Sequence, residues 1–208
     1  MLLDADDSQL VLVDYQVRLM PGIFEGDLVV ANAVRLARMA QVLMLPVWVT
    51  EENPEGLGPN VPALQEAIEA AGGRTMAKMH FSAVADGLAD WLRPPVRKPA
   101  QGGGNARSLP KHLQKPAPEP EEGKSTIVIA GCEAHVCLMQ TALDLLEEEF
   151  DVWVVTDACS SRSERNRDAA FDRLAGNGAE LVTTEMVAFE WLRTAEHPMF
   201  KEILGLVK

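Results

Sequence analysis

Short apolar segments alternate with helical periodicities along almost the whole chain, and this alternation constrains the fold more than any other feature. Continuously apolar strands are typical of a parallel sheet that helices cover on both faces. The handedness of strand crossovers then favours a doubly wound arrangement. We therefore predict an α/β fold, a three-layer α/β/α sandwich around a six-stranded parallel sheet of order 3-2-1-4-5-6. The expected strands are 10–13, 46–50, 75–77, 126–130, 151–156 and 180–182.

The stretches between these segments carry helix signals. Asp27 is a candidate N-cap, and Ser161-Arg162-Ser163-Glu164 has the form of a capping box. Gly176-Asn177-Gly178 marks the end of the helix that this box begins. We expect helices at 27–43, 62–71, 83–91, 137–149, 161–176, 184–193 and 198–206.

One segment departs from this pattern. Residues 94–124 are rich in proline and glycine, contain several charged residues and show no periodicity. Such a composition is typical of a surface insertion or a flexible loop and not of a domain. We therefore predict a single domain over residues 1–208 that this insertion interrupts.

Composition and charge exclude several classes of partner. The chain has 208 residues, 47% of them hydrophobic, and a formal net charge of −12, whereas nucleic acids and anionic membranes require clustered Lys and Arg. No apolar run approaches the roughly 20 residues that a membrane span needs. The acidic N-terminal residues lack the basic and then apolar pattern of a secretory signal. We expect a cytoplasmic protein without nucleic-acid or membrane partners.

The cysteines and histidines do not form a metal-binding pattern. The three cysteines, Cys132, Cys137 and Cys159, include no CxxC pair, and the four histidines show neither HxH nor HExxH spacing. The first expected strand is not followed by GxGxxG, so no motif supports a dinucleotide. We expect no metal and no cofactor, and a packing role for Cys132 and Cys159.

The segment Ser125–Cys137 holds the strongest candidate for chemistry. An apolar strand ends at Gly131, a short turn follows, and Cys137 opens an amphipathic helix. Backbone N–H groups and the positive end of a helix can hold a cysteine as thiolate near neutral pH. Cys137 is therefore a candidate nucleophile, although most free cysteines are small buried hydrophobes.

Two further side chains are expected at the same edge of the sheet. Asp14 follows the first strand and Lys78 the third, and ligands of doubly wound sheets bind beyond the carboxyl ends of the strands. Asp or Lys alone is common at such a position, but Asp14 and Lys78 together with Cys137 have the side chains that nucleophilic catalysis requires. Asp14 is the candidate general acid–base, Lys78 orients it and favours the thiolate, and the N–H groups of Glu133 and Cys137 are candidate oxyanion donors.

These segments resemble a known family over nearly the whole chain outside residues 94–124. The signature segments at 11–16, 78–82 and 131–137 are similar to those of the isochorismatase-like hydrolase superfamily, which includes nicotinamidases and N-carbamoylsarcosine amidase. Segments 50–58, 157–163 and 197–203 resemble a narrower subgroup, the isochorismatase domain-containing proteins.

The resemblance implies a Rossmann-like six-stranded parallel sheet and a catalytic triad of Asp14, Lys78 and Cys137. It also implies a cis peptide bond between Cys132 and Glu133, in the turn before the nucleophile. A homo-oligomer, a dimer or larger, is a further expectation from the family.

Two departures from family patterns narrow the expected activity. Metal-binding nicotinamidases carry Asp-x-His after the second strand, whereas this chain has Glu51-Glu52-Asn53 there, so a nicotinamidase-type zinc site is not expected. True isochorismatases, which cleave a vinyl ether, lack the cysteine nucleophile. Cys137 therefore favours acyl transfer on an amide-type bond.

The remaining candidates concern the pocket and the reaction. Tyr15, Gln16, Phe81 and His135 are candidates for lining the substrate pocket, with a core or structural role as the alternative for each. We expect a cysteine hydrolase that cleaves a C–N bond of a small molecule through a thioester. The alternative is a member of the same fold that binds a small metabolite or acts as a scaffold without catalysis.

Overall fold

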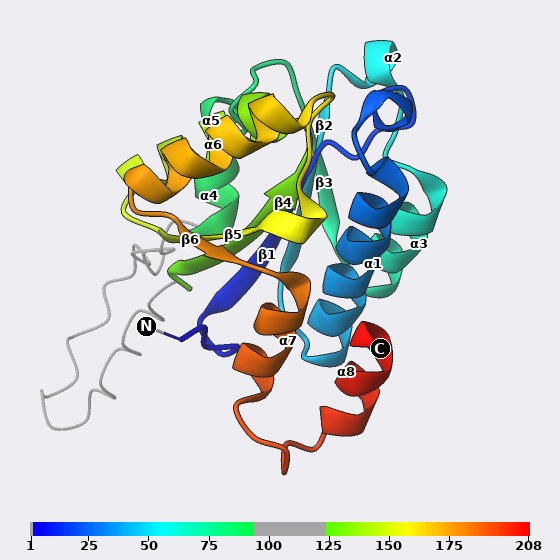
Figure 1. Ribbon diagram of the computed structural model, residues 1–208, viewed down its shortest axis with the longest axis vertical. Coiled ribbons are helices and arrows are strands. Elements are labelled where there is room, and N and C mark those ends of the chain that lie inside the picture. Colours follow the sequence, from blue (N-terminus) through cyan, green and yellow to red (C-terminus); the bar gives the residue numbers. More distant parts are fainter. Residues whose placement is uncertain (1, 94–123) are drawn as a thin grey trace, which may run out of the picture.

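The computed structural model describes residues 2–93 and 124–208, which form a parallel sheet with helices on both faces (Figure 1). The sheet has six strands in the order β3-β2-β1-β4-β5-β6, and every pair is parallel. The predicted fold class and strand order are confirmed. The strands are β1 (Ser8–Val13), β2 (Val47–Glu52), β3 (Arg74–Lys78), β4 (Thr126–Gly131), β5 (Asp151–Val155) and β6 (Glu180–Val182).

The helices form two layers. On one face α1 packs against α3, α7 and α8, and on the other α5 packs against α6 (Figure 1). The helices are α1 (Gly26–Val42), α2 (Pro54–Leu57), α3 (Pro62–Ala70), α4 (Leu88–Leu92), α5 (Met139–Glu147), α6 (Glu164–Gly176), α7 (Thr184–Leu192) and α8 (Phe200–Val207). Among the described residues, no helix combines the length and the hydropathy that crossing a membrane requires.

Three of the differences from the predicted bounds have an identifiable cause. Strand β2 runs two residues further than expected, because its pairing with β3 continues to the pair Glu52 and Lys78. The predicted helix 83–91 is divided at Gly87, whose φ of 95° is not helical, into a short 3₁₀ turn and α4. The predicted helix at Cys137 begins as a π-helical turn, Ala134–Leu138, that leads into α5. Of the predicted insertion, residues 94–123 lie outside the described residues.

The central strand β1 is buried along its whole length, and one of its side chains ties distant segments together. The amide nitrogen of Gln9 donates to the carbonyls of Leu92 and Lys124, at 3.1 and 3.0 Å. Its oxygen accepts a hydrogen bond of 2.8 Å from the indole of Trp48. Gln9 therefore holds together the described residues on either side of the insertion.

Strands β1 and β4 approach each other most closely where both end. Gly131 is the register partner of Val13, and a Cβ at Gly131 would lie 2.5 Å from both the Cβ and the carbonyl oxygen of Val13. Only glycine allows this approach without moving backbone. The turn that follows Gly131 is therefore held close to the end of β1.

Replacing Gly131 with alanine should lower the free energy of unfolding by about 3 kcal/mol or more, because the new methyl group overlaps the backbone of β1. Urea unfolding followed by circular dichroism measures this change. Gly176→Ala is the matched control, since a Cβ there meets no atom within 4 Å, and its stability should stay within about 1 kcal/mol of the wild type. Equal effects of the two substitutions would contradict the close-packing argument.

Candidate active site

Asp14 follows β1 directly and is completely buried. Its backbone has the left-handed conformation (φ 57°), which Asp adopts more readily than most residues. Its Oδ1 accepts a hydrogen bond of 2.6 Å from the hydroxyl of Thr50, and its Oδ2 lies 2.7 Å from the Nζ of Lys78. Strand β2 and strand β3 thus each supply one group that orients this carboxylate.

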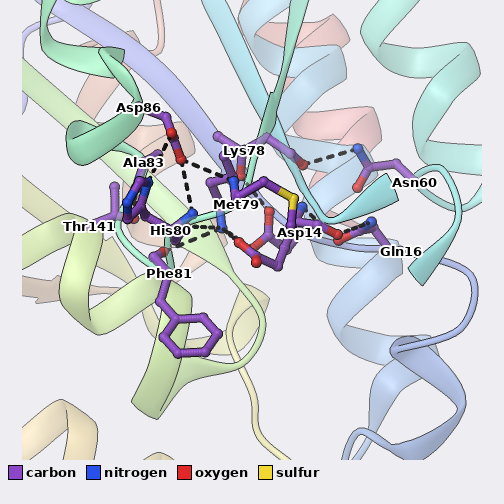
Figure 2. Close-up of polar contacts among 12 residues, drawn as sticks. Asp14, Gln16, Asn60, Lys78, Met79, His80, Phe81, Ala83, Asp86 and Thr141 are labelled. Carbon is purple, nitrogen blue, oxygen red and sulfur yellow. Dashed lines mark hydrogen bonds and ion pairs between the residues drawn. The ribbon is translucent and has the colours of Figure 1, made fainter. Parts of the chain in front are cut away.

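Lys78 ends β3 and is only 2% exposed. Its Nζ lies 2.8 Å from Oε2 of Glu52 and donates to the carbonyls of His80 and Phe81, at 3.2 and 3.3 Å (Figure 2). Burial alone would lower the pKa of Lys78, but the contacts with Asp14 and its other partners outweigh burial and raise that pKa. Lys78 is therefore an ammonium held between two carboxylates.

Cys137 lies in the π-helical turn before α5 and is 6% exposed. Its Sγ lies within 4.8 Å of a carboxylate oxygen of Asp14 and of Glu52. The structure thus brings Asp14, Lys78 and Cys137 together at one edge of the sheet, from three separate segments. Their catalytic roles stay a prediction.

The protonation state of Cys137 differs from the expectation. Burial raises the pKa of this thiol well above its usual value, the nearby Asp14 carboxylate raises it further, and the ammonium of Lys78 opposes both only in part. The expectation of a thiolate near neutral pH is therefore wrong. Burial and the two carboxylates raise the pKa of Cys137 by more than the positive end of the helix can lower it. The other cysteines are also buried thiols, and burial raises the pKa of Cys132 to about 12.

The turn before Cys137 has the expected backbone. The peptide bond between Cys132 and Glu133 is cis. The N–H of Ala134 donates to the carbonyl of Ser160 at 2.7 Å, so this N–H is already used by the fold. The carboxylate of Glu133 accepts from the backbone N–H of Arg162 and from its Nε, at 2.9 and 3.0 Å. The assignment of the Glu133 and Cys137 N–H groups as oxyanion donors stays a prediction.

Tyr15 and Gln16 both take part in the hydrogen bonding of the framework, and contact of either with a substrate stays a prediction. Both side chains are completely buried. The hydroxyl of Tyr15 donates to the carbonyl of Ala158 at 2.6 Å. The amide of Gln16 donates to the carbonyls of Glu52 and Gly58 and accepts from the N–H of Glu52. The two residues that follow Asp14 in the sequence thus complete the hydrogen bonding of the core.

The other two pocket candidates have separate positions. Phe81 is 53% exposed, and its ring points away from the pair of Asp14 and Lys78 (Figure 2). The Nδ1 of His135 lies 2.9 Å from the hydroxyl of Ser161, and its Nε2 lies 3.3 Å from the amide nitrogen of Asn166. Ser161 is therefore engaged by His135, and Ser163 is the N-cap of α6 in its place. Contact of Phe81 or His135 with a substrate stays a prediction.

Glu52 is the member of the site that the sequence reasoning missed. In the sequence it stands within Glu51-Glu52-Asn53, the segment that lacks the metal-binding histidine. The available signal was alternation: Thr50 and Glu52 are two residues apart, so both point to the same face of an extended strand. One face of β2 therefore contacts both Asp14 and Lys78.

A metal ion does not fit the donor atoms of this site. Among residues 2–93 and 124–208, donor atoms of Asp14, Glu52 and Cys137 lie within 4.8 Å of one another. The Nζ of Lys78 contacts both carboxylates, and its positive charge opposes a second cation there. Asn53 is turned away from this cluster and caps α2 through a hydrogen bond from the N–H of Gly56.

Comparison with known proteins identifies the family. The model of the isochorismatase domain matches residues 8–186. The chain belongs to the isochorismatase-like hydrolase family. A relative is isochorismatase domain-containing protein 2 of Rattus norvegicus, 35% identical over 203 residues, which are 98% of this chain and 82% of the relative.

Two solved structures share the fold over almost the full chain. The MAR1 ribonuclease of Caenorhabditis elegans is 30% identical with a TM-score of 0.82, and the match covers 100% of this chain and 92% of that one. YcaC of Pseudomonas aeruginosa, solved with hexane-2,5-diol and covalent acrylamide, is 27% identical with a TM-score of 0.77, covering 99% and 91% of the two chains.

Alkylation of Cys137 by iodoacetamide should be slow at pH 7 and should still accelerate above pH 8.5, because only the thiolate reacts and burial raises the pKa of this thiol. Peptide mass spectrometry after timed labelling measures the rate for each cysteine. Cys137 should react before Cys132 and Cys159, which are 0% and 2% exposed. Half-maximal reactivity below pH 8.5 would contradict the raised pKa.

Proposed function

We propose that this protein is a cysteine amidohydrolase that cleaves the C–N bond of a small amide through a thioester on Cys137. The observation that carries the proposal is the juxtaposition of the Cys137 thiol, the Asp14 carboxylate and the Lys78 ammonium at one buried edge of the sheet. A nucleophile beside a base that a third group orients is the general signature of covalent catalysis.

The first step is attack of the sulfur on the substrate carbonyl. Because the resting group is a thiol, its proton must leave as the S–C bond forms, and Asp14 is the base that receives it. A carboxylate oxygen of Asp14 lies within 4.8 Å of the sulfur, and Oδ2 is held 2.7 Å from the ammonium of Lys78. The carbonyl oxygen becomes an oxyanion, which the N–H groups of Glu133 and Cys137 are proposed to bind.

The next steps regenerate the enzyme. The tetrahedral intermediate collapses, the C–N bond breaks, and Asp14 returns the proton to the leaving amine. Water then attacks the thioester with Asp14 as base, the C–S bond breaks, and the proton passes to the departing sulfur. The products are an amine and a carboxylic acid. Lys78 keeps its proton throughout and holds the Asp14 carboxylate in place.

A related solved structure supports a reactive nucleophile in this fold. The YcaC structure contains covalent acrylamide, and acrylamide is an electrophile that adds to nucleophilic side chains such as thiolates. In this chain Cys137, which is 6% exposed and lies beside Asp14, is the candidate for such a nucleophile. The name of the MAR1 protein adds RNA as a second substrate class to test, but the net charge of −12 opposes binding of a polyanion.

Cys137→Ala should abolish turnover of any small amide that the wild type hydrolyses, with a loss on the order of a thousandfold or more in kcat, because no other group replaces the nucleophile. The measurement is amine release from a panel of short aliphatic, aromatic and carbamoyl amides. Rapid quenching followed by mass spectrometry should show the acyl adduct on the peptide that contains Cys137.

Cys159→Ser is the matched control, since this buried sulfur accepts a hydrogen bond from the N–H of Gly131, which a serine hydroxyl can also accept. Its turnover should stay within about threefold of the wild type. Activity that survives Cys137→Ala would refute the proposed nucleophile. Ligand binding without turnover by the wild type would favour the non-catalytic alternative, and cleavage of RNA with no amide turnover would favour the second substrate class.

A further inference from the structure

Glu52 has a fixed place beside Lys78 that follows from the sheet itself. The two residues are register partners at the ends of β2 and β3. Parallel neighbours in register point to the same face, and here Oε2 of Glu52 reaches the Nζ of Lys78 at 2.8 Å. Lys78 is therefore shared between Glu52 and Asp14.

The backbone of Glu52 is held by a buried amide. Its N–H donates to Oε1 of Gln16 and its carbonyl accepts from Nε2 of Gln16, each at 2.9 Å. Gln16 is completely buried, so a side chain of the framework is committed to placing Glu52. These two hydrogen bonds fix the backbone of Glu52, and they thereby fix the position from which its carboxylate reaches Lys78.

The charges of Asp14, Glu52 and Lys78 do not sum to zero. Asp14 and Glu52 contribute two negative charges when ionised and Lys78 contributes one positive charge, which leaves the cluster at −1. A net negative charge within a few ångströms of a thiol disfavours its thiolate. Consistently, the pKa of Cys137 is raised mainly by burial and then by Asp14, Lys78 lowers it, and Glu52 adds to the increase.

We propose that Glu52 is a positioning residue of the catalytic centre, which shares the Lys78 ammonium with Asp14 and thereby keeps Cys137 as a thiol while the site is empty. The inference rests on the proposed role of Cys137 as nucleophile. In this arrangement the proton moves to Asp14 only as the sulfur attacks a bound carbonyl. A buried thiol that stays protonated is also protected from electrophiles that are not substrates.

The ionisable groups around Cys137 come from the ends of four strands, and Asp14, Lys78 and Glu52 are those that shift its pKa. Asp14 follows β1, Glu52 ends β2, and Lys78 ends β3. The turn after β4 contributes the thiol of Cys132 and the carboxylate of Glu133, which Arg162 neutralises at 3.0 Å. Of the two carboxylates that contact Lys78, Glu52 is the one whose removal leaves the proposed nucleophile, base and ammonium in place.

The test is the rate of iodoacetamide labelling of Cys137 without substrate, from pH 6.5 to 10, in the full-length protein. Glu52→Gln keeps the size of the side chain and removes its charge. At pH 8 it should label Cys137 at least about tenfold faster than the wild type, because one unit of thiol pKa changes the thiolate fraction tenfold. Because burial raises the pKa of Cys137 well above its usual value, both proteins are mainly thiols over this pH range, and the ratio of the two rates should stay nearly constant.

Three variants separate charge from packing. Glu52→Asp keeps the charge and should label within about threefold of the wild type at pH 8. Glu51→Gln removes a neighbouring charge whose side chain binds Asn60 instead, and it should also behave as the wild type. Glu52→Met, similar in length and uncharged, repeats the test if the glutamine variant fails to fold.

Equal labelling rates of Glu52→Gln and the wild type at pH 8 would overturn the inference. An equal acceleration in Glu52→Asp, or parallel acceleration of labelling at the buried Cys132, would also overturn it, since either shows increased access and not a change in protonation. The outcome is independent of turnover. If no amide is hydrolysed but the labelling difference is found, the proposed function fails while the role of Glu52 in protonation stands.

Discussion

The contact between the Lys78 ammonium and the buried carboxylates is the interaction on which the rest of the site depends. Removing an ion from water costs several kcal/mol, and a buried charge is tolerated only when it is paired and hydrogen-bonded. Lys78 meets this condition with Asp14, Glu52 and two backbone carbonyls. Replacing a buried ion pair with apolar side chains is often neutral or stabilising. Its presence here is therefore better explained by chemistry than by stability.

The parallel sheet makes this arrangement possible. Strands β3, β2 and β1 are adjacent and all end at the same edge, so three separate chain segments place Lys78, Glu52 and Asp14 side by side. The fourth neighbour, β4, approaches β1 through Gly131 and continues into the turn that carries Cys137. Neighbouring strands thus supply the cation, the anions and the sulfur, and all of these side chains are buried.

The fold and three members of the site were predictable, because each depends on a short-range pattern. Apolar runs mark buried strands, and a polar residue directly after such a run lies at a strand end, as for Asp14. Glu52 was missed because the apolar run stops at Thr50, whereas pairing with β3 extends the strand by two residues. The thiol pKa was predicted wrongly because a local argument from the helix end omits burial and charges from other strands. Burial and charges from other strands cannot be inferred from the residues that neighbour Cys137 in the sequence.

The buried amide of Gln9 has a consequence for how the chain varies in length. It binds the carbonyls of Leu92 and Lys124, so both boundaries of the insertion are attached to the central strand. Residues added or removed between these two anchor points need not alter the spacing of β1, β2 and β4. The spacing of these strands and the length of the insertion can therefore change independently of each other.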